Sequence, residues 1–447
     1  MSARDLTQGS VPAHLLRLGA PMVLGVLAVL SINLADAYFV GQLGTDELAA
    51  LSFTFPVVLT ITSLSIGLSA GSSSIVSRAI GRGDDEGAKR LATDSLALAL
   101  LVVAIACGLG FLTVRPLFGA LGADGHVLDV VVEYMHIWFL GMPFLVVPMV
   151  GGGLIRANGD SLAPSLIMVF AAITNVILDP IFIHGGGPVP ELGVAGAAWA
   201  SLASRAVTLL ATAVLLVVRE KLLAFSLPSW STLKASWGQL LAVGVPAALS
   251  NMINPAAITL VTAILATFGK DTVAAFGVAT RVESFAAIPM LALSSAIGPI
   301  AGQNWGCGAP DRTRQAMRTA FSFCLAYSVV GFGVFLFAAE PVMGVFTSDP
   351  TVIEQGALYL RIVTGTLAGY GVLIVASATY NAIDHAVRGL GLTLLRSGAL
   401  YVPLASASLL VDDVRVAFIG IAIANVITGI AVWVLAFRLL PAPVDPT

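Results

Sequence analysis

The chain has 447 residues, of which 57% are hydrophobic and only 11% are charged, and its mean hydropathy is +0.96. Because soluble domains carry about a quarter of charged residues, this composition excludes a soluble globular protein. A net charge of −3, without a basic stripe, also gives no indication of nucleic-acid binding.

Apolar runs long enough to cross a bilayer recur along the whole chain, and short alternating segments typical of a β-barrel do not dominate. We predict an all-α polytopic membrane protein with twelve transmembrane helices. In chain order, the spans are expected at 15–40, 48–77, 91–113, 127–155, 162–184, 193–218, 238–268, 273–303, 316–338, 353–382, 388–410 and 414–438. Several exceed 25 residues, which implies tilt or ends that project beyond the hydrocarbon.

Two stretches of the chain repeat one sparse pattern at a single constant offset. Gly19, Pro21, Gly44, Asp46 and Gly81 recur as Gly244, Pro246, Gly269, Asp271 and Gly306. Six spans per half is an even number, so both halves enter the membrane the same way round, as parallel repeats about an axis along the membrane normal. We therefore predict two pseudo-symmetric six-helix bundles, 1–218 and 238–447, joined by a cytoplasmic linker at 219–237, that rock to expose a central cavity alternately.

Lys and Arg residues gather in alternate connections. They are Arg78, Arg82, Lys89 and Arg90 around the 2–3 connection, Arg219, Lys221 and Lys234 in the 6–7 connection, and Arg312, Arg314 and Arg318 after span 8. The intervening connections are poor in them. By the positive-inside rule, both termini face the cytoplasm, and the protein is a multi-pass protein of the cell (plasma or inner) membrane.

Two carboxylates lie inside apolar runs. Asp36 in span 1 and Asp179 in span 5 each lie about one and a half turns from the outer helix end, which predicts a similar depth. An ionised carboxylate at mid-helix costs on the order of 2.5–3.5 kcal/mol, so the pair is expected to bind a cation or share a proton. Alternatively, one Asp is merely hydrated near the interface.

Amides and a hydroxyl lie near these carboxylates. Asn33 and Asn175 share a helix face with Asp36 and Asp179, because they precede them by three and four residues. Ser201 adds a hydroxyl oxygen. Oxygen donors of this kind suit Na⁺ or a carboxylate that must be protonated. A rival interpretation makes the amides ordinary interhelical hydrogen-bond partners.

Further residues are candidates for a hinge or for the cavity. Pro21 and Pro246 mark either a hinge or helix entry at the membrane surface. Val261 occupies the position of Asp36 in the second half, which predicts coupling chemistry in the first bundle only. Glu283 either lines the cavity or lies near the outer interface. The other candidates for the cavity are Tyr38, Asn251, Asn254, Tyr370 and Asn381.

No motif supports catalysis or ATP use. The chain has no GxxxxGK[ST] loop and no soluble domain to house one, so we predict that it is not an enzyme and needs no cofactor. An ion gradient remains as the energy source, and it supplies about 2.3 kcal/mol per elementary charge per 100 mV.

The stretches NLADAYFVGQLGTDELAALSFTFP, SRAIGRGDDEGAKR, NVILDPIF and LGVAGAAWAS resemble multidrug and toxic compound extrusion (MATE) transporters, with a likeness over nearly the whole chain. The resemblance implies two six-helix bundles around a V-shaped cavity and export of drugs in exchange for Na⁺ or H⁺. Asp36, Asp179 and Asn175 match the amino-terminal cation site of the DNA-damage-inducible F-like branch, and Ser201 falls where that branch often has a hydroxyl. Asn254 takes the place of a span-7 glutamate of the other branch, which argues against a site of that type.

The leading hypothesis is a monomeric antiporter, coupled to H⁺ or Na⁺, that exports amphipathic, cationic small molecules. Its expected partners are these substrates and membrane lipids, and the sequence decides neither the substrate nor the ion. One alternative is a lipid-linked oligosaccharide flippase of the same superfamily, which would have a more cationic cavity and usually more than twelve spans. Another is a non-transporting receptor or structural protein.

Overall fold

The computed structural model describes residues 5–186, 189–224 and 229–438. The first half consists of α1 (Val11–Gly41), α2 (Thr45–Gly81), α3 (Asp85–Ala120), α4 (Gly125–Leu140), α5 (Met142–Ala157), α6 (Leu162–His184) and α7 (Gly193–Val214), followed by the π-helical turn η1 (Leu215–Arg219). An isolated bridge between Gly186 and Val189 accompanies the turn after α6.

The second half begins at Trp230 and is also helical. Its elements are α8 (Trp230–Ala266), α9 (Lys270–Ala286), α10 (Ile288–Gly306), α11 (Pro310–Gly344), α12 (Pro350–Val363), the 3₁₀ turn η2 (Thr364–Thr366), α13 (Leu367–Ala382), α14 (Ala386–Leu394), the π-helical segment η3 (Leu395–Tyr401), α15 (Val402–Ser406), α16 (Ser408–Val411) and α17 (Val414–Arg438).

The span count agrees with the sequence pattern. Within the described ranges, ten helical stretches are long and apolar enough to cross a membrane, and two bent pairs, α4 with α5 and α9 with α10, bring the number to twelve. The predicted spans 127–155 and 273–303 are therefore not straight, because each bends by 44°. Pro143 and Pro289 lie at the start of the second helix of each pair, where the missing N–H and the ring interrupt the helical ladder. The all-α fold with twelve spans is confirmed.

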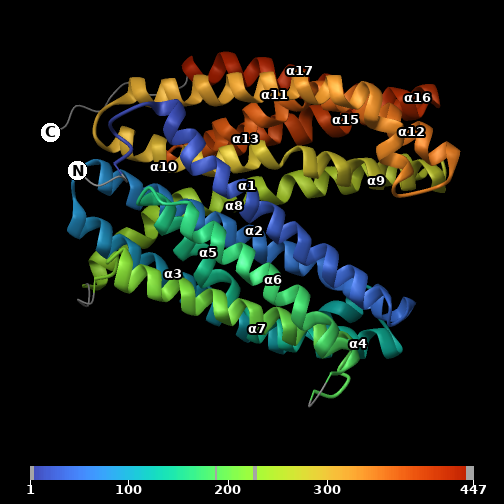
Figure 1. The fold of residues 1–447 in the computed structure, drawn as a ribbon, viewed down its shortest axis with the longest axis horizontal. Coiled ribbons are helices and arrows are strands. Elements are labelled where there is room, and N and C mark those ends of the chain that lie inside the picture. Colours follow the sequence, from blue (N-terminus) through green and yellow to red (C-terminus); the bar gives the residue numbers. More distant parts are fainter. Residues whose placement is uncertain (1–4, 187–188, 225–228, 439–447) are drawn as a thin grey trace.

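The helices form two bundles that converge at one end of the molecule. Figure 1 shows α3–α7 on one side and α11–α17 on the other, close together where both chain termini lie and apart at the opposite end. We call these the terminal end and the open end. The predicted limits of the two bundles, 1–218 and 238–447, and of the linker between them, 219–237, stay a prediction. In the structure, η1 ends at Arg219 and α8 begins at Trp230.

Glycines that recur in both halves of the sequence allow α2 and α10 to pack closely at the terminal end. A Cβ on Gly81 in α2 would collide with the backbone of Gln303 in α10, and a Cβ on Gly306 in α10 would collide with the backbone of Arg78 in α2. Arg78 and Gln303 are themselves related by the offset that separates the two glycines. A pseudo-two-fold axis therefore relates the two contacts to each other. The repeated glycines have a structural role, because the absence of a side chain lets the backbones of α2 and α10 approach closely.

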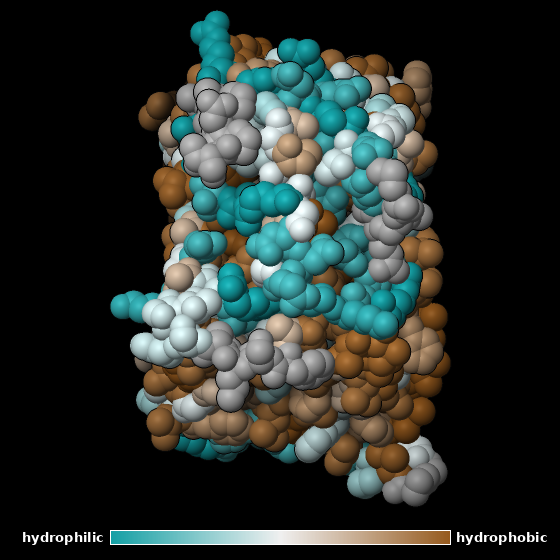
Figure 2. Space-filling model, turned by 90° about the vertical axis from the view of Figure 1, so that its left-hand side faces the viewer, coloured by the Kyte–Doolittle hydropathy of each residue, from teal (hydrophilic) through white to brown (hydrophobic). Residues whose placement is uncertain are grey.

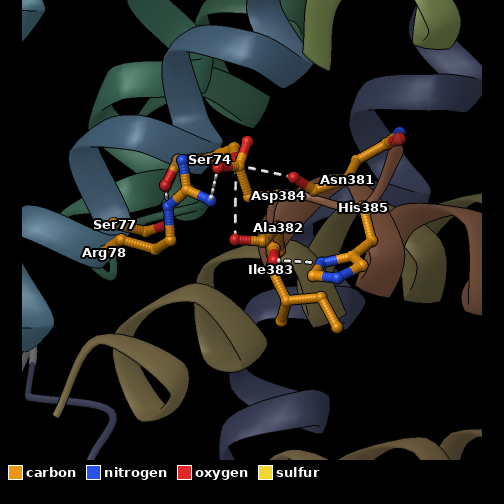
Figure 3. A network of polar contacts seen from close by, with 8 residues as sticks. All are labelled: Ser74, Ser77, Arg78, Asn381, Ala382, Ile383, Asp384 and His385. Atoms are coloured by element: carbon orange, nitrogen blue, oxygen red, sulfur yellow. Dashed lines mark hydrogen bonds and ion pairs between the residues drawn. The ribbon is translucent and has the colours of Figure 1, made fainter. Parts of the chain in front are cut away.

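Hydrogen bonds and an ion pair also hold the two bundles together at the terminal end, as Figure 3 shows. The Ser74 hydroxyl of α2 donates to the backbone carbonyls of Asn381 and Ala382 at 2.6 and 3.2 Å, and Arg78 Nη1 lies 3.3 Å from Asp384 Oδ2. Asp384 has a left-handed φ of +69°, which turns the chain sharply between α13 and α14. We call these five residues the terminal latch.

The terminal end presents a polar face. Figure 2 shows hydrophilic residues spread across it, while hydrophobic residues occupy the flanks. Its exposed polar residues include Arg82 and Asp84, between α2 and α3, and Asp85 and Glu86, in the first turn of α3. This distribution is typical of a helical bundle whose flanks face lipid and whose ends face water.

Candidate functional site

The first bundle brings Asp36 of α1 and Asp179 of α6 together. Each precedes the end of its helix, Gly41 or His184, by five residues, so at about 1.5 Å per residue both reach the same depth. Their carboxyl groups lie within hydrogen-bonding reach of each other. Asp179 is fully buried, and Asp36 is half-buried.

Asn175 and Ser201 complete this group on its buried side. Asn175 lies one turn before Asp179 in α6, and its Nδ2 donates to Asp179 Oδ1 at 3.3 Å and to Ser201 Oγ of α7 at 3.4 Å. Three helices therefore contribute polar atoms to one buried cluster, which we call the carboxylate cluster: Asp36, Asn175, Asp179 and Ser201.

The carboxylate cluster contains acceptors that lack donors. Asp36 Oδ1, Asn175 Oδ1 and Asp179 Oδ2 are buried and have no hydrogen-bond partner within the described part of the chain. A buried acceptor without a partner costs about 1–3 kcal/mol, and more when it is charged. Oxygen donors are the ligands of hard cations, and a carboxylate oxygen is also where a proton binds. The donor set therefore fits either Na⁺ or a shared proton.

A half-buried arginine, which the sequence analysis did not single out, adjoins this cluster. Arg205 follows Ser201 by one turn in α7, and its guanidinium lies 5.8 Å from the centre of the Trp138 ring. Its charge acts on Asp36 and on Tyr134. Two ionised carboxylates and one guanidinium leave one negative charge in excess, so a single proton or monovalent cation neutralises the group. The sequence could have pointed to Arg205, because a charged residue inside the predicted span 193–218 is unusual in a membrane.

The carboxylate cluster does not account for the other predicted residues. The side chain of Asn33 lies outside the described part of the structure. Tyr38 is 64% exposed, and its ring packs edge-to-face on Phe39. Asn251 is exposed on α8, where its amide donates to the Ala247 carbonyl at 2.8 Å. Asn381 belongs to the terminal latch.

The two candidate hinge prolines lie inside helices. Pro21 is within α1 and Pro246 is within α8, and both helices continue through them. Each removes one backbone hydrogen bond from its helix, which makes that position easier to bend. The hinge role itself stays a prediction.

The second bundle holds a different polar group, centred on Arg396 of η3. The Arg396 Nε donates to Asn425 Oδ1 at 3.0 Å, and its Nη1 donates to Asn254 Oδ1 at 2.9 Å. The guanidinium also lies 4.8 and 5.0 Å from the ring centres of Tyr370 and Tyr401. Asn254 and Tyr370 were sequence candidates, whereas Arg396 was missed although it lies inside the predicted span 388–410.

Glu283 belongs to the same region. Its Oε2 accepts a hydrogen bond of 2.5 Å from the Tyr359 hydroxyl, and its charge acts on Tyr401 and Tyr370. We call Asn254, Glu283, Tyr359, Tyr370, Arg396, Tyr401 and Asn425 the guanidinium cluster. The carboxylates of the first bundle have no counterpart here, because Val261 and Leu404 occupy the positions of the repeat that correspond to Asp36 and Asp179. The two bundles therefore share a scaffold and differ in charge.

Comparison with known proteins agrees with this architecture. The family model MatE matches residues 21–181 and 246–406, and these two matches are offset from each other exactly as Pro21 is from Pro246. The FAD transporter of Shewanella oneidensis is 38% identical over 425 residues, which cover 95% of this chain and 94% of that protein.

Solved structures agree over almost the whole chain. The MATE transporter VcmN of Vibrio cholerae superposes with a TM-score of 0.91 at 29% identity, covering 96% of this chain and 97% of that one. A structure described as the outward-facing conformation of a multidrug resistance MATE transporter gives 0.91 at 28% identity, covering 98% of both chains. The double family match, the curated relative and these neighbours show that the chain belongs to the MATE family of multi-pass membrane transporters.

Proposed function

We propose that the protein is an antiporter that exports amphipathic small molecules by alternating access and draws its energy from a gradient of H⁺ or Na⁺. The carboxylate cluster supports this proposal most directly. It combines two carboxylates within hydrogen-bonding reach, three buried acceptors without donors, and one excess negative charge. Uptake of one cation stabilises such a group of buried charges, and coupling of export to an ion gradient requires a site that takes up the ion.

In this mechanism, the cation binds between α1 and α6 from the open end. Asp36, Asn175 and Asp179 are the residues that would hold Na⁺, or the two carboxylates would share a proton. Neutralising the pair removes the repulsion between the two carboxylates and draws α1 toward α6. Because α1 also packs against α10 of the other bundle, a change in α1 alters the contact between the bundles. Substrate leaves to the outside, and the bundles then rearrange to open the terminal end.

We further propose that the terminal end faces the cytoplasm. Arg78, Arg82 and Arg312 lie at this end, in agreement with the positive-inside rule. The terminal latch closes this end, and the similarity to an outward-facing relative supports an outward-open state for the structure described. One chain holds both bundles and the whole carboxylate cluster, so we propose a monomer that uses an ion gradient and no cofactor.

The substrate has two candidate classes. Organic cations and other drugs follow from the resemblance to multidrug transporters. Flavin nucleotides are the second class, favoured by the 38% identity to an FAD transporter. A lipid-linked oligosaccharide flippase is less well supported, because the described residues provide no more than twelve spans.

Efflux by cells that lack their own pumps tests the proposal. We expect Asp36→Asn and Asp179→Asn each to reduce the rate of export of ethidium and of FAD by at least about tenfold, a factor that corresponds to about 1.4 kcal/mol of activation free energy. Asp129→Asn is the matched control. Asp129 is an exposed carboxylate that is not part of the carboxylate cluster, and its Oδ1 forms an ion pair with Arg115 Nη2 at a distance of 2.7 Å. Export at the normal rate by the Asp36 variant would contradict the mechanism.

A further inference from the structure

We infer that the guanidinium cluster of the second bundle is a subsite for an anionic phosphate group of the transported molecule. The inference rests on the proposed export function and assigns its substrate to phosphate-bearing amphipathic molecules, of which the flavin nucleotides are the example favoured above. It changes the expected charge of the substrate from cationic to anionic.

The guanidinium of Arg396 is held rigidly. Its residue is only 3% exposed, two asparagine oxygens fix its Nε and Nη1, and two tyrosine rings, Tyr370 and Tyr401, lie within 5.0 Å of it. A guanidinium is planar and offers five N–H donors in a fixed fork. Because its partners come from α8, α13, α17 and η3 itself, the fork cannot turn freely. The group is therefore preorganised to receive a ligand.

Part of this fork remains available. The Arg396 Nη2 has no hydrogen-bond partner within the described part of the chain, although it carries two N–H donors. A carboxylate or phosphate matches two parallel donors of a guanidinium. The neutral asparagine oxygens that occupy Nε and Nη1 leave the positive charge of Arg396 intact.

No acid neutralises this charge directly. The charge of Glu283 acts on Arg396, but its carboxylate is bonded to the Tyr359 hydroxyl, and the described residues contain no ion pair of Arg396 within 4.0 Å. A buried guanidinium without a close counter-ion is costly. An anion that reaches the free face of the fork relieves this cost, so the cluster favours an anionic ligand.

The subsite also lies at a suitable depth. Arg396 follows Ala386, the first residue of α14 at the terminal end, by ten residues, or about 15 Å of helix rise, which is near the middle of a ~30 Å hydrocarbon core. Its partner Asn254 belongs to α8, the helix whose Gly244 approaches Gly71 of α2 in the first bundle. Beyond this contact the bundles diverge toward the open end (Figure 1).

The two bundles then have complementary roles. The carboxylate cluster of the first bundle takes a cation, and the guanidinium cluster of the second takes the anionic part of the substrate. The sites lie in different bundles, so cation and substrate act on each other through the movement of the bundles rather than by competing for the same side chains.

Binding of three flavins to the purified full-length protein tests this inference, with quenching of flavin fluorescence as the readout. Riboflavin lacks a phosphate, whereas FMN and FAD carry one and two. We expect the native protein to bind FMN and FAD more tightly than riboflavin. Arg396→Gln should raise the Kd of FMN and FAD by about tenfold, the size expected for a charge-assisted hydrogen bond, and leave that of riboflavin unchanged.

Two further variants separate binding from folding. Glu283→Gln removes the negative charge near Arg396 and keeps an acceptor for Tyr359, so it should lower the Kd of FMN. Arg361→Gln, which breaks an exposed ion pair with Glu340 at 3.0 Å, is the matched control and should change none of the three constants.

Three outcomes would overturn the inference. They are equal affinity of the native protein for all three flavins, an equal loss for all three in Arg396→Gln, and displacement of FMN by phosphatidylglycerol but not by inorganic phosphate. The first would show that phosphate is not recognised, the second that Arg396 only supports the fold, and the third that the subsite holds a lipid headgroup. Loss of gradient-coupled efflux in Asp36→Asn, measured with whichever of ethidium and FAD the native protein exports, tests the proposed function separately, so each can fail without the other.

Discussion

At the scale of single residues, the arrangement of buried charge distinguishes the two bundles. Asp36 and Asp179 share one cluster with a single arginine, whereas Arg396 has no carboxylate in direct contact within the described part of the chain. Charges inside a membrane protein are costly, and they persist where they serve binding or coupling. The first cluster has an excess negative charge, which favours a cation. In the second, Glu283 balances the charge of Arg396 without forming an ion pair with it, so the unpaired N–H donors of Arg396 are the feature that favours an anion.

Arg205 should set how tightly the carboxylate cluster holds its cation. Arg205→Gln removes the only positive charge that acts on Asp36 within the described residues, so the pair should take up H⁺ or Na⁺ at a lower concentration. We expect the half-saturating ion concentration for efflux to fall by about tenfold, since charge interactions in partly buried sites reach the order of 1 kcal/mol or more. Efflux measured across a series of pH and Na⁺ values gives this constant.

Arg205→Lys keeps the charge and is the control for that experiment; its half-saturating concentration should stay close to that of the native protein. A higher ion requirement in Arg205→Gln would contradict the role assigned here. It would mean that the arginine helps to bind the ion rather than competing with it.

The sequence revealed all four residues of the carboxylate cluster but only three of the seven in the guanidinium cluster, Asn254, Glu283 and Tyr370. Asp36, Asp179 and Asn175 could be found because carboxylates in apolar runs are rare, and helical spacing placed the amide beside its carboxylate. The contact of Arg396 with Asn425 and Asn254 could not be found, because these residues lie on three helices and no spacing along the chain relates them. Arg205 and Arg396 were nevertheless visible as intramembrane charges.

At the scale of helices, the approach of α2 to α10 requires glycine. The predicted experiment compares Gly81→Ala and Gly306→Ala, in which a Cβ meets the backbone of Gln303 or Arg78. We expect both variants to lose export to a similar degree, because the pseudo-two-fold axis exchanges the two contacts and the terminal end can no longer close. Export of ethidium and thermal stability in detergent are the measurements.

Gly108→Ala in α3 is the matched control, because a Cβ there meets no atom within 4 Å. Replacing glycine by alanine inside a helix favours the helix by about 1 kcal/mol, so the control should be at least as stable as the native protein. Normal export by Gly81→Ala would show that this contact is not needed for transport.

The bends of α4–α5 and α9–α10 show the limit of hydropathy. The stretches 127–155 and 273–303 are each apolar enough overall to be taken as a single span, so the pattern predicts one uninterrupted span in each case. Proline marks the position, at Pro143 and Pro289, but composition does not give the angle of 44°. Neighbouring helices determine how far such a kink opens.

At the scale of the whole molecule, the two halves share their backbone scaffold but differ in the residues proposed for function. The duplication is visible in the sequence as one constant offset and returns in the contacts of Gly81 and Gly306. These contacts preserve the symmetry that rocking of two bundles requires. The residues proposed to bind the ion break it, because Val261 and Leu404 replace the two carboxylates in the second half. A symmetric scaffold thus carries asymmetric chemistry.

Gradient-driven substrate uptake in reconstituted vesicles tests the central claim most directly. Vesicles containing the native protein or Asp179→Asn receive an imposed gradient of pH or of Na⁺, and accumulation of FAD and of ethidium is followed against substrate binding by the same samples. We predict that the native protein accumulates substrate with one of the two gradients, and that Asp179→Asn binds substrate but does not accumulate it. Accumulation by Asp179→Asn at the native rate would contradict coupling through the carboxylate cluster.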